Sequence, residues 1–161
     1  MDYIIISDKN RKEELLFRCI GLDEIEQIKE LFLNVFTAEP WNDDWSDVKQ
    51  LDLYLKDLVG QNSSLAFGLF EDGCLIGLSM GCIRHWYTGT EYYIDELCIR
   101  KDLQGRGLGA RFLHKIEDSI RDMGLSQIFL QTEASVPAYD FYRKNGYQEL
   151  KGHVSFAKKI S

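Results

Sequence analysis

A turn with three glycines in five residues is the part of this chain best suited to binding a ligand. It reads Gln104-Gly105-Arg106-Gly107-Leu108-Gly109. Glycine lets the backbone come close to a ligand, and the first N–H groups of a helix point outward, where the helix dipole adds partial positive charge. The turn therefore predicts an anion site. A P-loop is excluded, because Gly109 is followed by Ala110 and Arg111 instead of Lys and then Ser or Thr.

A dinucleotide-binding fingerprint is an alternative for the same turn. Gly105 and Gly107 supply its GxG, but the third glycine is displaced to Gly109, and charged residues at 100–102 separate the turn from the strand before it. The turn could also be a plain glycine-rich helix cap, although three glycines exceed what one cap requires. The pattern therefore favours an anion of another kind.

A second candidate site is the loop of residues 39–45, which holds two tryptophans and three acids. Such a surface can hold an amine by ion pairing and cation–π contact. In this interpretation the substrate is bound by Glu39, Trp41, Asp44 and Trp45. In the alternative, both tryptophans anchor the loop on the core while the acids are only solvated, and the sequence leaves the two equally open.

An apolar strand and an amphipathic helix must position the glycine turn. The strand covers residues 92–99 and is interrupted only by Asp95 and Glu96. From Leu108 onward, apolar residues recur every three or four positions, which predicts a helix that Gly124 ends. Alternation along the strand puts one carboxylate on each face. The predicted faces are Tyr93, Asp95, Leu97 and Ile99 against Tyr92, Ile94, Glu96 and Cys98.

The rest of the chain reads as strands and helices without repeats or linkers. Before the central strand we predict strands at 3–7 and 15–20, a helix that Asp23 and Glu26 cap and Pro40 ends, and a helix at 46–59 with Val48 and Tyr54 on its inner side. Strands at 65–70 and 74–84 follow, joined by an Asp-Gly hairpin. After the helix that Gly124 ends, we predict a strand at 127–132 parallel to the central one, a short helix from Pro137, and an antiparallel pair at 147–150 and 154–158.

Composition limits the classes of protein that this chain can be. Its 161 residues fit one domain, and 45% hydrophobic residues suffice for a core. We expect a cytoplasmic protein without a membrane partner, because no stretch reaches the length of a membrane span and Met1-Asp2-Tyr3 lacks the basic start of a signal peptide. A net charge of −7 argues against nucleic acid and suits a cationic substrate, though it also serves solubility.

The cysteines and histidines predict no metal site. Neither the four cysteines nor the three histidines form a cluster with ligand spacing, and no CxxC pair occurs. Each cysteine lies in an apolar strand-like segment, so we expect buried free thiols.

The glycine turn and a second motif together resemble the GNAT superfamily of N-acetyltransferases. Gln104-x-x-Gly107-x-Gly109 looks like that superfamily's acetyl-coenzyme A signature, and Ala138-xxx-Tyr142-xxx-Gly146-Tyr147 resembles its second landmark. Residues 94–97 and 131–133 are similar to bacterial aminoglycoside 6'-N-acetyltransferases. The resemblance implies an α/β (α+β) GNAT fold, with one domain over residues 1–161. Its central sheet would be mixed, mostly antiparallel and six- to seven-stranded, and flanked by about four helices.

The resemblance also implies acetyl-CoA as the cofactor. The cofactor would be held by the strand before the turn, by the turn itself and by the second motif, namely by Leu97, Cys98, Ile99, Gln104, Gly105, Arg106, Gly107, Leu108, Gly109, Ala110 and Ser135. The backbone N–H groups of residues 97–99 would also stabilise the oxyanion. At Ser135 the family often has Asn, and a hydroxyl there can still hydrogen-bond the pantetheine amide.

Acetyl transfer to an amine requires a base, because an ordinary alkylamine is almost entirely protonated near neutral pH. Asp95 is the first candidate, since it matches the acid of the aminoglycoside group, and Glu96 is the second. A bulge that the family places on this strand would decide which acid faces the substrate. Tyr142 matches the tyrosine that often protonates the departing thiolate, with packing in a helix as the alternative role.

The sequence thus predicts an acetyl-CoA-dependent N-acetyltransferase acting on a small cationic amine by direct attack in a ternary complex. Aminoglycosides, polyamines and amino-acid derivatives all suit the acidic loop, and a protein N-terminus or lysine stays open as acceptor. The rival hypotheses are a non-catalytic acyl-CoA-binding sensor and a nucleotide oxidoreductase. Family members commonly dimerise, so the resemblance also allows a homodimer.

Overall fold

The structure is a computed structural model that describes residues 2–8 and 11–161, with side chains described from Glu14 onward. The chain divides into two compact units, Met1–Gln131 and Thr132–Ser161, and each is described by itself. The described residues include no helix that is long and apolar enough to cross a membrane.

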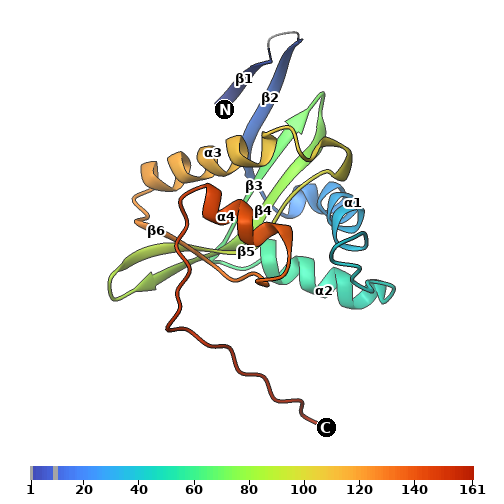
Figure 1. The fold of residues 1–161 in the computed structure, drawn as a ribbon. Helices are drawn as coiled ribbons and strands as arrows, with labels where there is room; N and C mark the ends of the chain where they lie inside the picture. Colours follow the sequence, from blue (N-terminus) through green and yellow to red (C-terminus); the bar gives the residue numbers. More distant parts are fainter. Residues whose placement is uncertain (1, 9–10) are drawn as a thin grey trace. The chain divides into compact units, whose positions relative to one another are not determined.

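The first unit is built on a six-stranded mixed sheet whose strands follow one another in sequence order (Figure 1). Strands β1 to β5 pair antiparallel, and β6 pairs parallel to β5. The sheet confirms the predicted mixed, mostly antiparallel topology, at the lower of the two expected strand numbers. The strands are β1 Asp2–Asp8, β2 Arg11–Ile20, β3 Ser64–Glu71, β4 Cys74–Trp86, β5 Gly89–Ile99 and β6 Gln127–Leu130.

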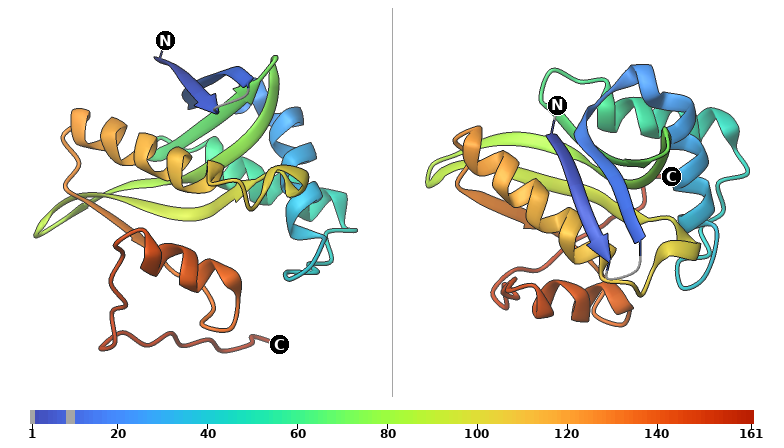
Figure 2. Two further views of the ribbon diagram at one scale, coloured as in Figure 1. Left: turned by 45° about the horizontal axis from the view of Figure 1, so that its top comes forward. Right: turned by 90° about the horizontal axis from the view of Figure 1, so that it is seen from above.

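Helices cover both faces of the sheet (Figure 2). Helices α1 (Ile25–Phe36) and α2 (Val48–Val59) pack on one face, where their buried side chains join those of Leu78, Met80 and Cys98. Helix α3 (Leu108–Asp122) lies on the other face, where Phe112 contacts Phe17 of β2. The apolar stripes predicted for these helices are therefore confirmed, because each stripe packs against one face of the sheet.

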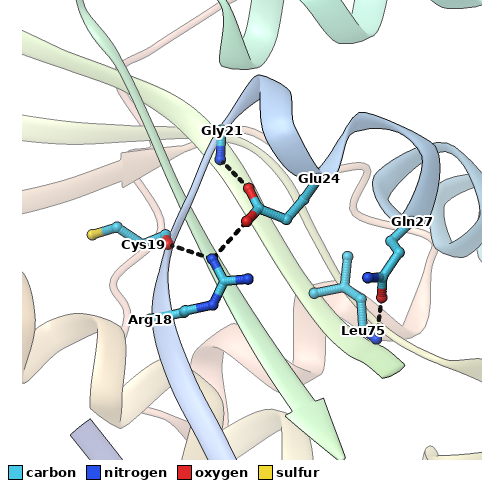
Figure 3. A network of polar contacts seen from close by, with 6 residues as sticks. All are labelled: Arg18, Cys19, Gly21, Glu24, Gln27 and Leu75. Atoms are coloured by element: carbon cyan, nitrogen blue, oxygen red, sulfur yellow. Dashed lines mark hydrogen bonds and ion pairs between the residues drawn. The ribbon is translucent and has the colours of Figure 1, made fainter. Parts of the chain in front are cut away.

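The start of α1 differs from the prediction by one short turn. The predicted capping box of Asp23 and Glu26 is absent, because the 3₁₀ turn η1 (Leu22–Glu24) precedes the helix with Gly21 as its N-cap. The Glu24 carboxylate accepts a hydrogen bond from the Gly21 N–H at 2.9 Å and another from Arg18 at 2.7 Å (Figure 3). Gln27 then accepts from the Leu75 N–H, which ties α1 to the start of β4.

Helix α2 begins later than predicted. Its N-cap is Asp47, whose side chain accepts a hydrogen bond from the Gln50 N–H, so the helix starts at Val48 and not at residue 46. Val48 is therefore a first-turn residue with an exposed side chain, although the pattern placed it inward. Leu51, Leu55 and Leu58 are buried as predicted.

The second unit contains helix α4 (Pro137–Lys144), which begins with Pro137 as predicted. Gly146 follows it with a φ of +87°, as a glycine stop requires. The predicted strand pair at 147–150 and 154–158 is wrong, because these residues form no strand. Val154 and Phe156 are exposed, so the alternation there provides no buried face to stabilise a pair of strands.

Candidate active site

A β-bulge in β5 determines where its two acids lie. Met80 of β4 pairs with Glu96 and the next residue, Gly81, pairs with Ile94, so Asp95 is the extra residue. A Cβ atom at Gly81 would overlap the carbonyl oxygen of Tyr93. The bulge therefore requires glycine at this position of the neighbouring strand.

The bulge reverses the alternation of β5. Before it, Tyr92 packs on Phe67 and hydrogen-bonds with Ser79 on the α3 face. After it, Cys98 is buried in the core formed with α1 and α2, and Glu96 lies opposite Met80 of that same core. The prediction that Tyr92, Ile94, Glu96 and Cys98 share one face is thus wrong, while the bulge that the family resemblance implied is confirmed.

Glu96 is a largely buried carboxylate with a hydrogen-bond donor. The Tyr54 hydroxyl of α2 donates to Glu96 Oε1 at 2.6 Å. Burial raises the pKa of Glu96 to about 7, and the charges of Asp95 and Asp43 act in the same direction, while the Tyr54 hydrogen bond opposes them. A carboxylate of this kind can exchange a proton near neutral pH.

Asp95 is more exposed than Glu96. Partial burial raises its pKa, and the positive charge of Arg84 on β4 lowers it. The Arg84 guanidinium carbon lies 3.9 Å from the ring centroid of Tyr93, so its position is fixed by a cation–π contact.

The tryptophans of the loop at 39–45 pack on the core. Trp45 stacks on Tyr54 with ring centroids 5.1 Å apart, and Trp41 contacts Phe36 at 5.7 Å. These contacts fit the anchoring alternative. Glu39 and Asp44 are exposed, and Asp44 accepts a hydrogen bond from the Ser46 N–H.

The acid of this loop whose charge raises the pKa of Glu96 is Asp43, which was not among the substrate-binding residues predicted from the sequence. Tyr54 was read only as an inward residue of α2, because an apolar stripe does not reveal where a hydroxyl group points. Gly81 had a signal, since an isolated glycine inside a strand suggests a bulge or a close backbone approach. Arg84 carried no such signal.

The glycine turn follows β5 and opens α3. Gly105 and Gly107 both have φ +76°, and a Cβ atom at either would meet no atom within 4 Å. Gly107 is the N-cap of α3 and provides no side-chain cap, so the N–H groups of Leu108, Gly109 and Ala110 have no partner within the helix. Outward-pointing N–H groups of this kind are the donors that a backbone anion site needs, and anion binding at this turn stays a prediction.

Side chains hold the segment before the turn in place. Gln104 donates from Nε2 to the Ile99 carbonyl oxygen at 2.8 Å, and Asn34 of α1 accepts from the Lys101 N–H at 3.1 Å. Arg100 and Asp102 form an ion pair, and Arg106 is exposed. The Gln104 side chain thus fixes the end of β5, and its predicted contact with the cofactor stays a prediction.

The parallel pairing of β5 with β6 ends at Ile94 and Leu130. In the described part of the chain no further ladder continues along this edge, so Leu97, Cys98 and Ile99 have a strand partner only in β4, although the Ile99 carbonyl oxygen also accepts from Gln104. An extended ligand with amide groups could hydrogen-bond to such an edge. The Cys98 side chain itself is buried, so only its backbone could take part.

Ser135 and Tyr142 belong to the second unit. Ser135 is exposed, two residues before the start of α4. Tyr142 is half-buried and packs between Phe141 at 5.3 Å and Tyr147 at 5.5 Å. Within the described residues no group of three or more His, Cys, Asp or Glu side chains could hold a metal ion.

Comparison with known proteins connects this geometry to a family. The model of the acetyltransferase (GNAT) family matches residues 25–147. A curated relative, thialysine N-ε-acetyltransferase of Sus scrofa, is 24% identical over 82 residues, which make up 50% of this chain and 48% of that protein. The chain therefore matches about half the length of that curated relative.

Solved structures with the same fold include two aminoglycoside acetyltransferases. One is meta-AAC0020 from an uncultured soil metagenomic sample in complex with sisomicin, with a TM-score of 0.71, 20% identity, and coverage of 91% of this chain and 97% of that chain. The other is AAC(6')-Iy in complex with a bisubstrate analog, with a TM-score of 0.69, 16% identity, and coverage of 91% and 99%. At these identities the likeness establishes the fold.

Proposed function

Because the chain belongs to the acetyltransferase (GNAT) family, we propose that it transfers an acetyl group from acetyl-CoA to a primary amine of a small cationic acceptor, by direct attack in a ternary complex. The observation that carries this proposal is Glu96, a largely buried carboxylate with a pKa of about 7 on the strand whose unpaired edge at residues 97–99 leads to the glycine turn. These three features supply a base, a site for an extended ligand and a site for an anion.

The residues of the turn fit a diphosphate. The backbone at Gly105 and Gly107 is open, and the helix N–H groups of Leu108, Gly109 and Ala110 provide donors without a side-chain competitor. The edge at residues 97–99 would hold the pantetheine amides and orient the thioester carbonyl toward backbone N–H groups. Acetyl-CoA supplies the activated acetyl group. The residues of this chain bind acetyl-CoA, remove a proton from the amine and donate a proton to the departing thiolate.

The acceptor amine must lose a proton before it attacks. Glu96 is the proposed base, since its pKa near 7 is much closer to that of an ammonium group than an ordinary carboxyl pKa is. The sequence favoured Asp95 as base. Because Asp95 is more exposed than Glu96, we assign it the role of holding the ammonium group together with Asp43.

Tyr142 is the proposed donor of a proton to the departing thiolate, and Ser135 the proposed hydrogen-bond partner of pantetheine. Both roles rest on the match of Ala138, Tyr142, Gly146 and Tyr147 to the second family motif. Replacing Tyr142 by Phe should slow turnover with little change in the Kd for CoA. Weaker CoA binding with unchanged turnover would instead indicate a packing role.

A small cationic acceptor is supported by three acids, Asp43, Asp95 and Glu96, which interact electrostatically around Tyr54. Acceptors of this class occur among the similar proteins, whose names include aminoglycoside and thialysine acetyltransferases. Polyamines and amino-acid derivatives share the same chemistry of an amine flanked by further positive charge. A protein N-terminus or lysine is the less favoured acceptor.

The test is thiol release from acetyl-CoA across a panel of aminoglycosides, polyamines, amino-acid derivatives and a basic peptide. Turnover with a multiply charged small amine, together with mass-spectrometric detection of the acetylated product, would support the proposal. Tight binding of CoA with no turnover for any amine would contradict it and indicate an acyl-CoA sensor instead.

A further inference from the structure

Tyr54 reaches Glu96 from a different element of the fold. It lies on α2, one position before the fully buried Leu55, at the edge of the helix's apolar stripe. From there its hydroxyl donates to Glu96 Oε1 at 2.6 Å, across 42 residues of sequence. This distance is at the short end for a hydrogen bond between a hydroxyl and a carboxylate.

The ring of Tyr54 is fixed by other aromatic side chains. Trp45 stacks on it with an interplanar angle of 17°, and Phe32 contacts it with ring centroids 6.0 Å apart. Phe32 also contacts Trp45 at 5.4 Å, so the three rings form one cluster. A ring held in this way fixes the position of its hydroxyl oxygen within hydrogen-bonding distance of Glu96.

We infer that Tyr54 is a positioning residue that holds the Glu96 carboxylate through Oε1 and leaves Oε2 to take the proton of the acceptor amine. This inference rests on the proposed function, because it assigns Tyr54 a part in the same proton transfer. Tyr54 does not itself touch the reacting atoms. It acts by fixing the orientation of Glu96 and by stabilising its charged form.

The charged and titratable groups around Glu96 are Tyr54 from α2, Asp43 from the loop before α2, and Asp95 and Cys98 from β5. Burial and the two aspartates raise the pKa of Glu96, and the Tyr54 hydrogen bond lowers it. Burial and the nearby acids also raise the pKa of the Tyr54 phenol, so it stays protonated and donates. Tyr54 is therefore the group that opposes the rise in the pKa of Glu96 and favours its ionised form near neutral pH.

The test is the Tyr54→Phe variant, which removes the hydroxyl and keeps the ring in its aromatic cluster. The acidic limb of kcat/KM should move upward by about one pH unit, because the ionised carboxylate loses its donor. The rates of the variant and the wild type should converge at high pH. Tyr87→Phe is the matched control, since Tyr87 is 88% exposed on the β4–β5 hairpin, and its pH profile should equal that of the wild type.

A purely structural role for Tyr54 would give a different result. Activity would then fall by the same factor at every pH with an unshifted limb, and this outcome would overturn the inference. A double-mutant cycle adds a second criterion, because Tyr54→Phe should cause no further loss in a Glu96→Gln background. An equal loss in both backgrounds would also count against the inference.

A measurement without turnover separates this inference from the proposed function. The Glu96 side-chain carboxyl is titrated by carbon-13 NMR in the wild type and in Tyr54→Phe, with no substrate present. A higher pKa in the variant supports the inference even if no amine is acetylated, in which case only the proposed function fails. An equal or lower pKa overturns the inference even if the wild type is an active acetyltransferase.

Discussion

At the scale of single residues, the candidate site depends on the Glu96 carboxylate, which is largely buried and forms no ion pair with a described cationic side chain. Glu96 is surrounded by a phenol, a thiol and two other acids, and among the described side chains no basic residue contributes to its pKa shift. Such an arrangement lowers the stability of the folded chain, and it brings the pKa of Glu96 toward the range that the proposed role as a base requires. Both consequences can be measured.

The effect on stability has a defined pH window. Burial raises the pKa of Glu96 from 4.5 to about 7 in the folded chain, so between these values the folded chain keeps a proton that the unfolded chain has lost. The free energy of unfolding must therefore decrease as the pH rises through this window. In Glu96→Gln this decrease is absent, and at about pH 8 the variant should be more stable than the wild type by up to about 3 kcal/mol.

Chemical denaturation of both proteins at low and high pH checks this expectation. At about pH 4 the advantage of Glu96→Gln should vanish, because the carboxyl is protonated in both the folded and the unfolded state. Glu30→Gln, at an exposed position of α1, is the control and should show no comparable pH dependence. A Glu96→Gln difference of equal size at both pH values would mean that its ionisation is not linked to folding.

Asp95 should affect binding of the amine more than its deprotonation. Asp95→Asn removes one negative charge from a half-exposed site, so the KM for a cationic amine should rise by about fivefold while the acidic limb persists. Steady-state kinetics with one amine at several pH values measures both quantities. Asp72→Asn is the control, because Asp72 lies in a distant turn with φ +48°, which Asn also adopts. Loss of the limb in Asp95→Asn would reassign the base.

At the scale of elements, the bulge in β5 and the turn before α3 decide where the functional groups lie. Both depend on backbone conformations or contacts that only glycine allows without cost. The first places Glu96 on the α2 face, and the second exposes the N-terminus of α3. Substitutions at these glycines should therefore have separable effects.

Gly81→Ala should destabilise the whole sheet. Its Cβ atom would overlap the Tyr93 carbonyl oxygen, which is backbone and cannot rotate away. We expect a loss of about 3 kcal/mol or more in the free energy of unfolding. Thermal or denaturant unfolding measures this loss, with Gly152→Ala as the control, because a Cβ atom there meets no atom within 4 Å. An effect equal to that of the control would refute the proposed requirement for glycine.

Gly107→Ala should weaken CoA binding beyond its effect on stability. The backbone φ of +76° costs an L-residue roughly 1 to 2 kcal/mol, although space for the Cβ atom is free. Gly124→Ala is a closely matched control, since Gly124 has φ +82°, the same free space, and a position at the far end of α3. Calorimetric titration with CoA should show a higher Kd for Gly107→Ala only, and equal affinities would contradict the assignment of the turn.

At the scale of the whole molecule, the sequence predicted what depends on periodicity and on local motifs. The amphipathic stripes of the three helices in the first unit, the β3–β4 hairpin and the parallel β5–β6 crossover all follow from apolar spacing and turn residues, and all are present. The alternation predicted for β5 failed after Ile94, because one extra residue reverses the faces, and the only sign of it in the sequence lies on the neighbouring strand, at Gly81.

The predicted strands at 147–150 and 154–158 failed for a related reason. Alternation favours a strand only where one face becomes buried, and burial depends on what the segment packs against. The same limit applies to the site. Asp95 and Glu96 were visible as candidates, but the donor Tyr54 lies 42 residues away and became apparent only from the packing of α2 on the sheet.

The most direct test of the proposed chemistry is the pH dependence of kcat/KM for an acetylated amine in the wild type and in Glu96→Gln. For the wild type, kcat/KM should rise about tenfold per pH unit below a pKa near 7 and level off above it. In Glu96→Gln this limb should disappear and the plateau should fall by at least about a hundredfold. A wild-type limb retained in Glu96→Gln would contradict the role of Glu96 as the base.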